Sequence, residues 1–341
     1  MGTRKKITLH DLSAELGLSV QTISKALSGK PGMSEETRSR IARTAYLRGY
    51  LTVAQARELA SRGIAPYPTF QLRFALIQSR QSANYNQLLS GGLQQRLELL
   101  AHRLECHTLD ADLPDRAFRE WLEETNLLTA DGLFIAPRLV SDTMERQLLA
   151  LPVPKVLINY PKPLSAVDSV IWDVYEAVCL AVDKLVRQGH TRIMYVGDRD
   201  SQRGYVRRWQ AFQEMMGAHG LTCASGDQLA GNWDEVALLE KLETLRPTAL
   251  IAGIDEEVGR LLRSLEVLDY RLPEQLSVIG LTNGSVAACP LLSRPELLIR
   301  ETGYKAADRL LRRIANPSEP WEHIRIAGPF HEGGTVQRPS S

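Results

Sequence analysis

The stretch TLHDLSAELGLSVQTISKALSG, residues 8–29, decides the architecture of the N-terminal part of this chain. Thr8 followed three residues later by Asp11 is the pattern of a capping box, in which two free amides at a helix start are satisfied reciprocally. Leucines then recur at helical spacing until Gly17, where a left-handed residue would end the helix. Ser19 is a natural N-cap for a second helix. The spacing therefore predicts two short helices joined by a tight turn.

A third helix is predicted after the turn at residues 29–32, with Ser34 as its N-cap. The apolar positions of the second and third helices would pack inward; they are Ile23, Ala26, Leu27, Ile41, Ala42, Ala45 and Tyr46. Two helices joined by a Gly-containing turn and supported by a third form a helix-turn-helix.

The other side of the second helix carries Val20, Gln21, Ser24, Lys25 and Ser28. Gln21 and Lys25 lie one turn apart, and these side chains suit adenine and guanine edges in the major groove. Thr22 and the amides at the helix start suit phosphates. Periodicity alone leaves a second interpretation open, a plain three-helix bundle with a polar surface.

Charge is concentrated at the N-terminal end. The whole chain of 341 residues has a net charge of only +1, yet residues 1–63 hold eleven Lys/Arg against five Asp/Glu and carry +6. A basic head on a mildly acidic body is typical of a nucleic-acid-binding domain fused to another domain. A solvated basic face is the alternative.

Residues 7–38, continuing in register to Gly49-Tyr50, resemble the head of the lactose-repressor (LacI/GalR) family of bacterial transcription regulators. The resemblance implies that Val20 and Gln21 read bases, and that Lys25 stands where the family commonly has Arg or Lys. The DNA-binding set that we expect is Thr8, Ser19, Val20, Gln21, Thr22, Ser24, Lys25, Ser28 and Leu59.

Leu59 belongs to residues 51–68, which the resemblance identifies as a hinge helix and linker after the helix-turn-helix of residues 1–50. In the family a leucine of this helix enters the minor groove, where an apolar wedge unstacks a base step and bends the duplex. Thr52-Val53 replaces the Pro-Asn that the family usually has there. A helical linker with a stray apolar residue is the alternative.

From residue 69 onward the pattern changes to alternating strands and helices. Buried apolar runs occupy residues 72–78, 132–136, 155–159, 193–197, 248–253 and 277–281. Repeated βα units imply parallel, doubly wound sheets, and two packed subdomains are favoured over one large sheet. The predicted fold is thus an all-α helix-turn-helix followed by an α/β core of two doubly wound parallel-sheet subdomains.

The resemblance extends through residues 69–341 and implies an effector-binding and dimerisation core like that of periplasmic sugar-binding proteins. It implies an N-subdomain of about 71–163 plus 293–327 and a C-subdomain of about 164–292 plus 328–341. We expect an effector in the cleft between them, at the carboxyl ends of the strands.

The expected effector-binding residues are Asn84 and Tyr85, in the loop after the first strand, together with Asn159, Trp172, Arg208, Gly253, Asp255, Thr282 and Asn283. Arg208 stands where the family keeps a ligand-binding Arg, and a surface Arg at a helix start is the alternative. Gly253-Ile254 replaces the usual Asn-Asp, and Thr282 follows strand 277–281 where the family often has Asp. Trp172 is a ligand platform or a core residue. Fewer carboxylates beside a retained Arg favour an anionic or amide-bearing ligand, or a cleft that senses no small molecule.

Composition excludes other classes. No run approaches 18 apolar residues, so we expect no membrane span. The N-terminus lacks the apolar core of a signal peptide, and the four scattered cysteines suggest neither a zinc site nor disulfides. We therefore expect a cytoplasmic protein. No motif marks an enzyme or a cofactor, and we expect none. The sequence therefore predicts a homodimeric repressor that binds a pseudo-palindromic double-stranded DNA operator and answers to a sugar, sugar acid, sugar phosphate or similar effector. The alternatives are a regulator of the same fold that senses no small molecule, and a solute-binding protein.

Overall fold

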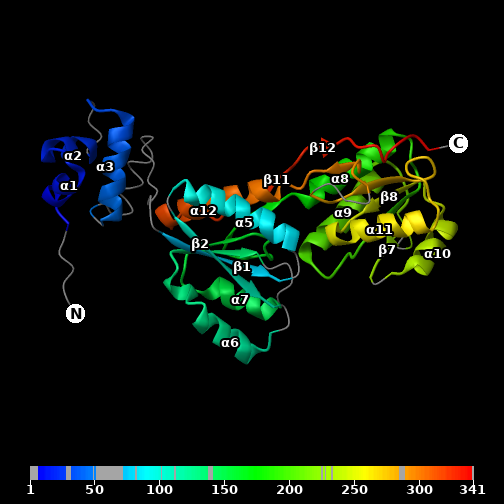
Figure 1. Ribbon diagram of the computed structural model, residues 1–341, viewed down its shortest axis with the longest axis horizontal. Coiled ribbons are helices and arrows are strands. Elements are labelled where there is room, and N and C mark those ends of the chain that lie inside the picture. Colours follow the sequence, from blue (N-terminus) through cyan, green and yellow to red (C-terminus); the bar gives the residue numbers. More distant parts are fainter. Residues whose placement is uncertain are drawn as a thin grey trace. The chain divides into compact units, whose positions relative to one another are not determined.

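The structure is a computed structural model, shown as a ribbon in Figure 1. It describes residues 7–27, 32–48, 50, 72–80, 83–100, 102–110, 113–136, 141–223, 226, 228–231, 233–283 and 289–339. The head and the two compact units of the core are described separately below.

The head packs α1 (Leu9–Leu16), α2 (Val20–Leu27) and α3 (Glu35–Leu47) around one small core. Its buried side chains are Leu12, Ile23, Ala26, Ile41, Ala42 and Ala45. Gly17 has φ 64° at the end of α1, and its amide donates to the Ser13 carbonyl. The predicted helices and caps of the helix-turn-helix are confirmed, because each is encoded by signals within a few residues of it.

The chain divides into two compact units and crosses between them after Ser169, Thr302 and His323. Unit 1 comprises residues 1–169 and 303–323, and unit 2 comprises residues 170–302 and 324–341. Three elements straddle the crossings: β5 (Asp168–Trp172), α12 (Ile299–Ala315) and β11 (His323–Ile326).

Within unit 1, the described strands order as β11-β5-β4-β3-β1-β2. The other elements of this part are β1 (Arg73–Ser79), α5 (Ala83–Glu98), β2 (Arg103–Leu109), α6 (Asp115–Glu124), η1 (Leu127–Thr129), β3 (Gly132–Ala136), α7 (Asp142–Ala150) and β4 (Lys155–Leu157). Strands β1, β3 and β4 pair in parallel, as the buried apolar runs predicted. Strand β2, which pairs in parallel with β1, was not predicted because most of its residues are not fully buried.

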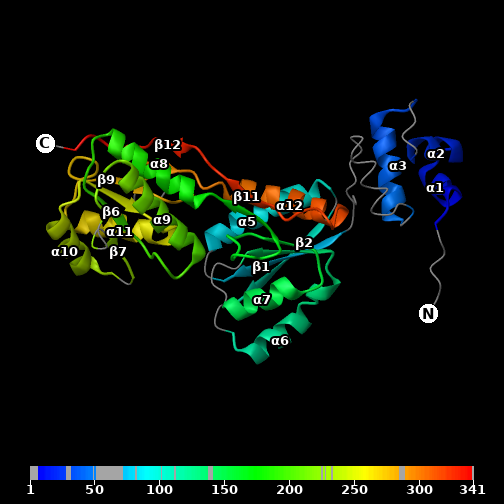
Figure 2. The ribbon, with the colours of Figure 1, turned by 180° about the vertical axis from the view of Figure 1, so that it is seen from behind.

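Helices cover both faces of this sheet. Figures 1 and 2 both show α5 and α12 on one face and α6 and α7 on the other. Phe74 and Gly132 face Leu310 of α12, whereas Ala75 and Leu133 belong to the cluster that contains Phe118 of α6. Neighbouring residues of one strand therefore enter opposite layers, which is why both are apolar.

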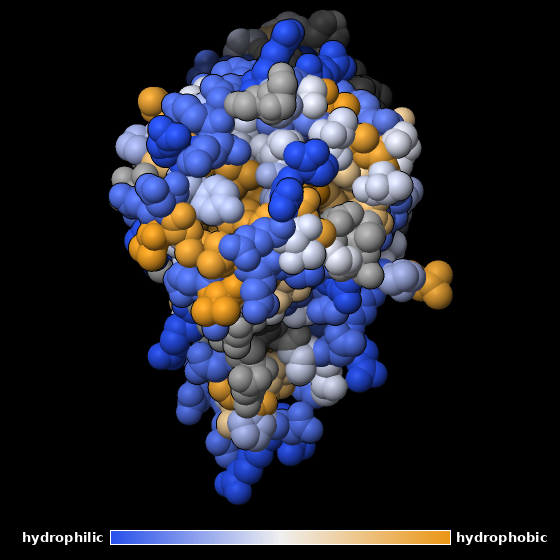
Figure 3. Space-filling view, turned by 90° about the vertical axis from the view of Figure 1, so that its right-hand side faces the viewer, coloured by the Kyte–Doolittle hydropathy of each residue, from blue (hydrophilic) through white to orange (hydrophobic). Residues whose placement is uncertain are grey.

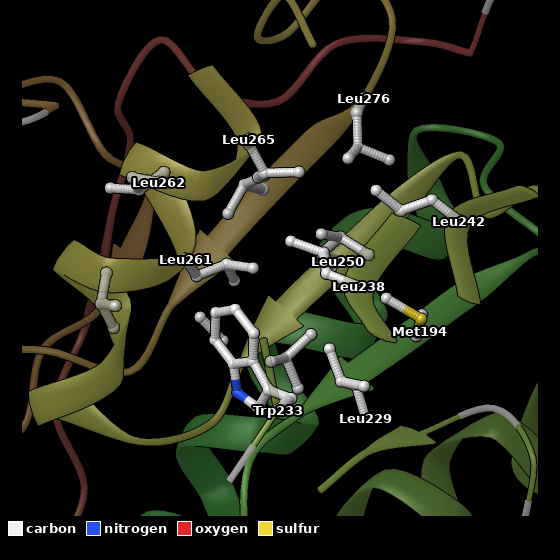
Figure 4. Packing of buried hydrophobic residues seen from close by; sticks show 14 of the residues in the cluster. Met194, Leu229, Trp233, Leu238, Leu242, Leu250, Leu261, Leu262, Leu265 and Leu276 are labelled. Carbon is white, nitrogen blue, oxygen red and sulfur yellow. The ribbon is translucent and has the colours of Figure 1, made fainter. Parts of the chain in front are cut away.

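In unit 2 the parallel sheet has the order β7-β6-β8-β9, and a two-stranded antiparallel sheet pairs β10 with β12. Its elements are α8 (Val174–Arg187), β6 (Ile193–Val196), α9 (Arg203–Ala218), β7 (Gln228–Leu229), α10 (Glu235–Leu245), β8 (Ala249–Ala252), α11 (Asp255–Val267), β9 (Ser277–Gly280), β10 (Arg294–Pro295) and β12 (Phe330–His331). Figure 4 shows the leucine-rich cluster of this unit, with Trp233 beside Leu229 and Leu261. The expectation of two doubly wound sheets is confirmed.

The surface drawn in Figure 3 mixes hydrophilic and hydrophobic residues. The large hydrophobic side chains that unit 2 leaves exposed include Val236, Val267 and Leu291. Among the described residues, no helix is both long enough and apolar enough to cross a bilayer.

Candidate functional site

The solvent-facing side of α2 carries the residues that the sequence assigns to base contact. Gln21, Ser24 and Lys25 are exposed, and Val20 and Thr22 are partly exposed. Residues four apart on a helix are neighbours on its surface, so Gln21 and Lys25 project from one face. A short helix that is packed on one side and polar on the other can enter the major groove and present these two side chains to base edges.

Hydrogen bonds at the helix starts hold this face in place. The Asp11 amide donates to Thr8 Oγ1 at 3.3 Å, and the Thr8 amide donates to Asp11 Oδ2 at 2.8 Å. At the start of α2, the Thr22 amide donates to Ser19 Oγ at 3.1 Å, and the two hydroxyl oxygens lie 2.9 Å apart. In this structure Thr8 and Ser19 therefore act as N-caps, and Thr22 is the residue whose amide Ser19 caps, which holds the start of each helix.

Arg38 of α3 is a positioning residue that the sequence analysis did not identify. Its side chain is buried, and Nη1 donates to the Ala26 carbonyl at 3.2 Å. A cation is favourable at the carboxyl end of α2, where carbonyls lack partners within the helix. The contact joins residues twelve positions apart, so local spacing could not reveal it. Ser28 and Leu59, the other two members of the expected DNA-binding set, lie outside the described residues.

In unit 2, Arg208 and Gly253 meet at the carboxyl end of β8. Arg208 lies within α9 and is buried, so the alternative of a surface Arg at a helix start is wrong. Its Nη1 donates to the Gly253 carbonyl at 2.5 Å, and its guanidinium lies 5.3 Å from the centre of the Tyr205 ring. Arg208 Nε is buried and has no hydrogen-bond partner among the described residues. The guanidinium is thus held from one side, and one buried N–H remains to be satisfied.

Tyr195 explains why residue 253 is a glycine. A Cβ atom at Gly253 would lie 2.0 Å from Tyr195 Oη and 2.2 Å from Cζ. The phenol therefore fills the space that a side chain at residue 253 would need. Tyr195 is fully buried, and burial raises the pKa of its hydroxyl while the Arg208 charge opposes the rise. The sequence analysis noted the glycine, but not the tyrosine that requires it.

The same strand edge carries the residues that follow β9. Ala252 of β8 pairs with Gly280 of β9, which places Thr282 and Asn283 beside the end of β8. Thr282 is buried, and neither amide atom of Asn283 has a hydrogen-bond partner among the described residues. Asp255 begins α11 directly after this edge.

Trp172 is the last residue of β5 and is buried. Both interpretations of this tryptophan remain compatible with that position, because a ligand platform and a core residue can each be buried.

Two further polar side chains on α11 were missed. Glu257 Oε2 and the Nε and Nη2 atoms of Arg260 are buried and have no hydrogen-bond partner in the described part of the chain. The Arg260 guanidinium lies 3.8 Å from the centre of the Trp233 ring. Burial raises the pKa of Glu257, and the charge of Arg260 opposes part of that rise. In sequence, Glu257 and Arg260 look like the charged residues of a solvent-exposed helix face. Nothing in the residue pattern of α11 therefore distinguished these two buried side chains from the exposed ones beside them.

In unit 1, Asn84 and Tyr85 differ from their predicted setting. We expected them in the loop after the first strand, but they lie in the first turn of α5, where Asn84 is exposed and Tyr85 is buried. The helix starts within a few residues of β1, and Asn86 on it donates to the Ser79 carbonyl at 2.7 Å. Asn159 follows β4, and its Oδ1 accepts a hydrogen bond from the Tyr160 amide at 2.8 Å.

Comparison with known proteins agrees with this architecture. Residues 182–336 match the model of a periplasmic binding protein-like domain. Catabolite control protein A of Priestia megaterium is 23% identical over 299 residues, which cover 85% of this chain and 86% of that protein. The HTH-type transcriptional repressor PurR of Vibrio vulnificus (strain CMCP6) is 25% identical over 323 residues, covering 90% of this chain and 92% of the relative.

Among solved structures, the lac repressor dimer bound to operator and the anti-inducer ONPF superposes with a TM-score of 0.65. The two are 18% identical, and the match covers 98% of this chain and 100% of that one.

The chain therefore joins a helix-turn-helix head to a core that matches a periplasmic binding protein-like domain. Over most of its length it is similar to transcription regulators of the lactose-repressor kind, the resemblance that the head sequence indicated. Relatives such as PurR are transcription regulators and not enzymes.

Proposed function

We propose that this chain represses transcription by binding a pseudo-palindromic DNA operator as a homodimer. The observation that carries the proposal is the exposed polar face of α2, with Gln21 and Lys25 one turn apart on a helix that is otherwise packed. Two copies related by a two-fold axis would place two such helices in successive major grooves, so the two half-sites should be inverted copies. The structure of the lac repressor dimer on its operator supports this arrangement by analogy.

The basic head supplies the part of the affinity that does not depend on base sequence. Its charge of +6 attracts the phosphate backbone, and this contribution falls as salt rises. Leu59 is proposed as the minor-groove wedge of a hinge helix, on the resemblance alone. DNA bound by a Leu59→Ala variant should be bent less than DNA bound by the wild type. Equal bend angles would refute the role of Leu59 as a wedge.

The core is proposed to bind a small effector with residues at the carboxyl ends of its strands. In unit 2 these residues include Arg208, Thr282 and Asn283, and several of their buried polar atoms lack partners among the described residues. Such atoms call for a ligand or ordered water. Effector and operator would be linked because each favours one conformation of the protein, and the coupling must be reciprocal. A basic helix-turn-helix head suits DNA and has no use in a solute-binding protein, so we disfavour that alternative. We propose that the protein acts in the cytoplasm, where its operator lies.

Gln21→Ala tests the proposal most directly. Operators selected from random DNA are compared with scrambled duplexes at fixed salt by fluorescence anisotropy. A bidentate base contact discriminates by about 1–3 kcal/mol, so the operator affinity should fall roughly 5- to 150-fold while binding to scrambled DNA changes little.

Gln87→Ala, on the exposed surface of α5, is the matched control and should behave like the wild type. Equal losses of Gln21→Ala on operator and scrambled DNA would remove Gln21 from base readout.

A further inference from the structure

Arg260 of unit 2 has the same setting as a second arginine that already holds a carboxylate. In unit 1, the Arg313 guanidinium lies 4.2 Å from the centre of the Trp321 ring. Its Nε donates to Asp168 Oδ2 at 2.6 Å and its Nη2 donates to Asp168 Oδ1 at 3.2 Å. One edge of a tryptophan-stacked guanidinium thus grips both oxygens of one carboxylate, which is the geometry that Arg provides and Lys does not.

In unit 2 the same edge has no occupant. The Arg260 guanidinium lies over the Trp233 ring, 3.8 Å from its centre, which is within the range of a cation–π contact. Its Nε and Nη2, the two atoms that hold the carboxylate in the Arg313 case, are buried and have no hydrogen-bond partner among the described residues. Leaving two charged N–H groups buried and unsatisfied is costly, so this edge requires a partner.

The neighbouring residues limit what that partner is. Glu257, one turn earlier on α11, has a buried Oε2 without a hydrogen-bond partner in the described residues, and a carboxylate oxygen accepts from hydroxyl donors. The same unit has further buried polar atoms without hydrogen-bond partners among the described residues, Arg208 Nε and the side-chain amide of Asn283 at the carboxyl ends of β8 and β9. This combination of one bidentate oxyanion receptor with separate donors and acceptors fits a hydroxylated molecule that carries a carboxylate or a phosphate.

We propose that Arg260, stacked on Trp233, is the oxyanion receptor of the unit 2 ligand site, and that the effector is a hydroxylated carboxylate or phosphate such as a sugar acid or sugar phosphate. This inference rests on the proposed effector function and narrows it to anionic ligands. Two vicinal hydroxyls of a neutral sugar could also accept from this fork, but a carboxylate or phosphate adds the charge that makes bidentate hydrogen bonds with Arg strong.

Calorimetric titration of the full-length protein at constant ionic strength tests the assignment. The probes are gluconate, glucose 6-phosphate, inorganic phosphate and, as the neutral comparison, glucose. At least one oxyanion probe should bind, and glucose should bind more weakly than the best of them. The carboxylate and the phosphate probes are titrated under the same conditions, so their relative affinities show which oxyanion the site prefers.

Arg260→Gln keeps most of the side chain's length but removes the charged fork. Charge-assisted hydrogen bonds contribute about 1.5–3 kcal/mol each, so this variant should lose at least about tenfold in affinity for the oxyanion. Arg260→Lys keeps the charge without the fork and should also lose affinity. Arg263→Gln, an exposed arginine on the same helix, is the matched control and should bind like the wild type.

Three results would overturn the proposal. They are the absence of binding by any oxyanion probe up to 20 millimolar (roughly the limit of a weak specific site), an equal loss in Arg263→Gln, and undiminished binding in both Arg260 variants. In each case ordered water satisfies the Arg260 edge. Operator binding is measured on the same samples. If the wild type does not bind operator DNA, the regulator function is refuted, while the Arg260 oxyanion site is judged by the ligand titrations alone.

Discussion

Asp168 is the centre of a buried charge cluster in unit 1, and its replacement by Asn should destabilise the core strongly. The carboxylate is completely buried. Arg309 Nε donates to Oδ1 at 2.9 Å, Arg313 Nε donates to Oδ2 at 2.6 Å, and the Glu322 amide donates to Oδ1 at 2.9 Å. Asp168→Asn leaves the buried Arg313 guanidinium facing a neutral amide, whereas Arg309 keeps Glu322 Oε2 at 2.9 Å from its Nη1. Breaking a buried ion pair from one side costs about 3–5 kcal/mol, because the remaining charge is uncompensated.

The pH dependence of stability provides a second signature. Burial by itself raises the pKa of Asp168, but the hydrogen bonds from Arg313, the Glu322 amide and Arg309 outweigh it and hold the pKa below its usual range. A carboxyl whose pKa is lower in the folded protein contributes stability above its unfolded pKa of about 3.9 and loses that contribution as pH falls toward the folded value. The difference between wild type and Asp168→Asn should therefore be constant near neutral pH and shrink below about pH 4.

Urea unfolding followed by circular dichroism at several pH values measures both effects. Asp308→Asn, on the helix α12 that carries Arg309 and Arg313, is the control, since Asp308 pairs with Arg96 at 2.6 Å but both side chains are partly exposed. An exposed pair contributes about 0–1 kcal/mol, so this variant should unfold close to the wild type. A loss below about 1 kcal/mol for Asp168→Asn, or a loss that does not diminish in acid, would refute the reasoning.

Two further predictions concern packing and capping. Gly253→Ala places a Cβ 2.0 Å from Tyr195 Oη and should lower the free energy of unfolding by about 1–3 kcal/mol. Adding Tyr195→Leu to that variant should restore part of the loss, and urea unfolding of the single and the double variant measures both effects. An unchanged free energy of unfolding in Gly253→Ala would show that Tyr195 moves aside without cost. Thr8→Ala removes a side chain that accepts from the Asp11 amide at 3.3 Å, and the loss of about 1 kcal/mol should raise amide hydrogen exchange in α1 roughly fivefold. Unaltered exchange in α1, with α3 as internal reference, would contradict the role of the cap.

The head could be predicted almost residue by residue because its structure is local. Thr8 and Asp11 stand within one turn of each other, Gly17 ends α1 through its own φ of 64°, and Ser19 caps the next helix. Buried parallel strands are nearly as readable, since both faces are covered and the run must be apolar throughout. The start of α5 was misjudged: Asn84 was expected in a loop, although Ser82, a residue type common at N-caps, directly precedes Ala83 in the sequence.

The amino-acid sequence by itself determined the helix-turn-helix, the alternation of parallel strands with helices, and the polar character of the α2 face that we propose binds DNA. Only the tertiary structure decided which charged side chains are buried and which of them face each other. Asp168 and Arg313 are 145 positions apart, yet they share two hydrogen bonds. Arg260 and Trp233 stack although they belong to different helix–strand units. The burial of a charge depends on partners brought together by the fold, and no local pattern of residues records that.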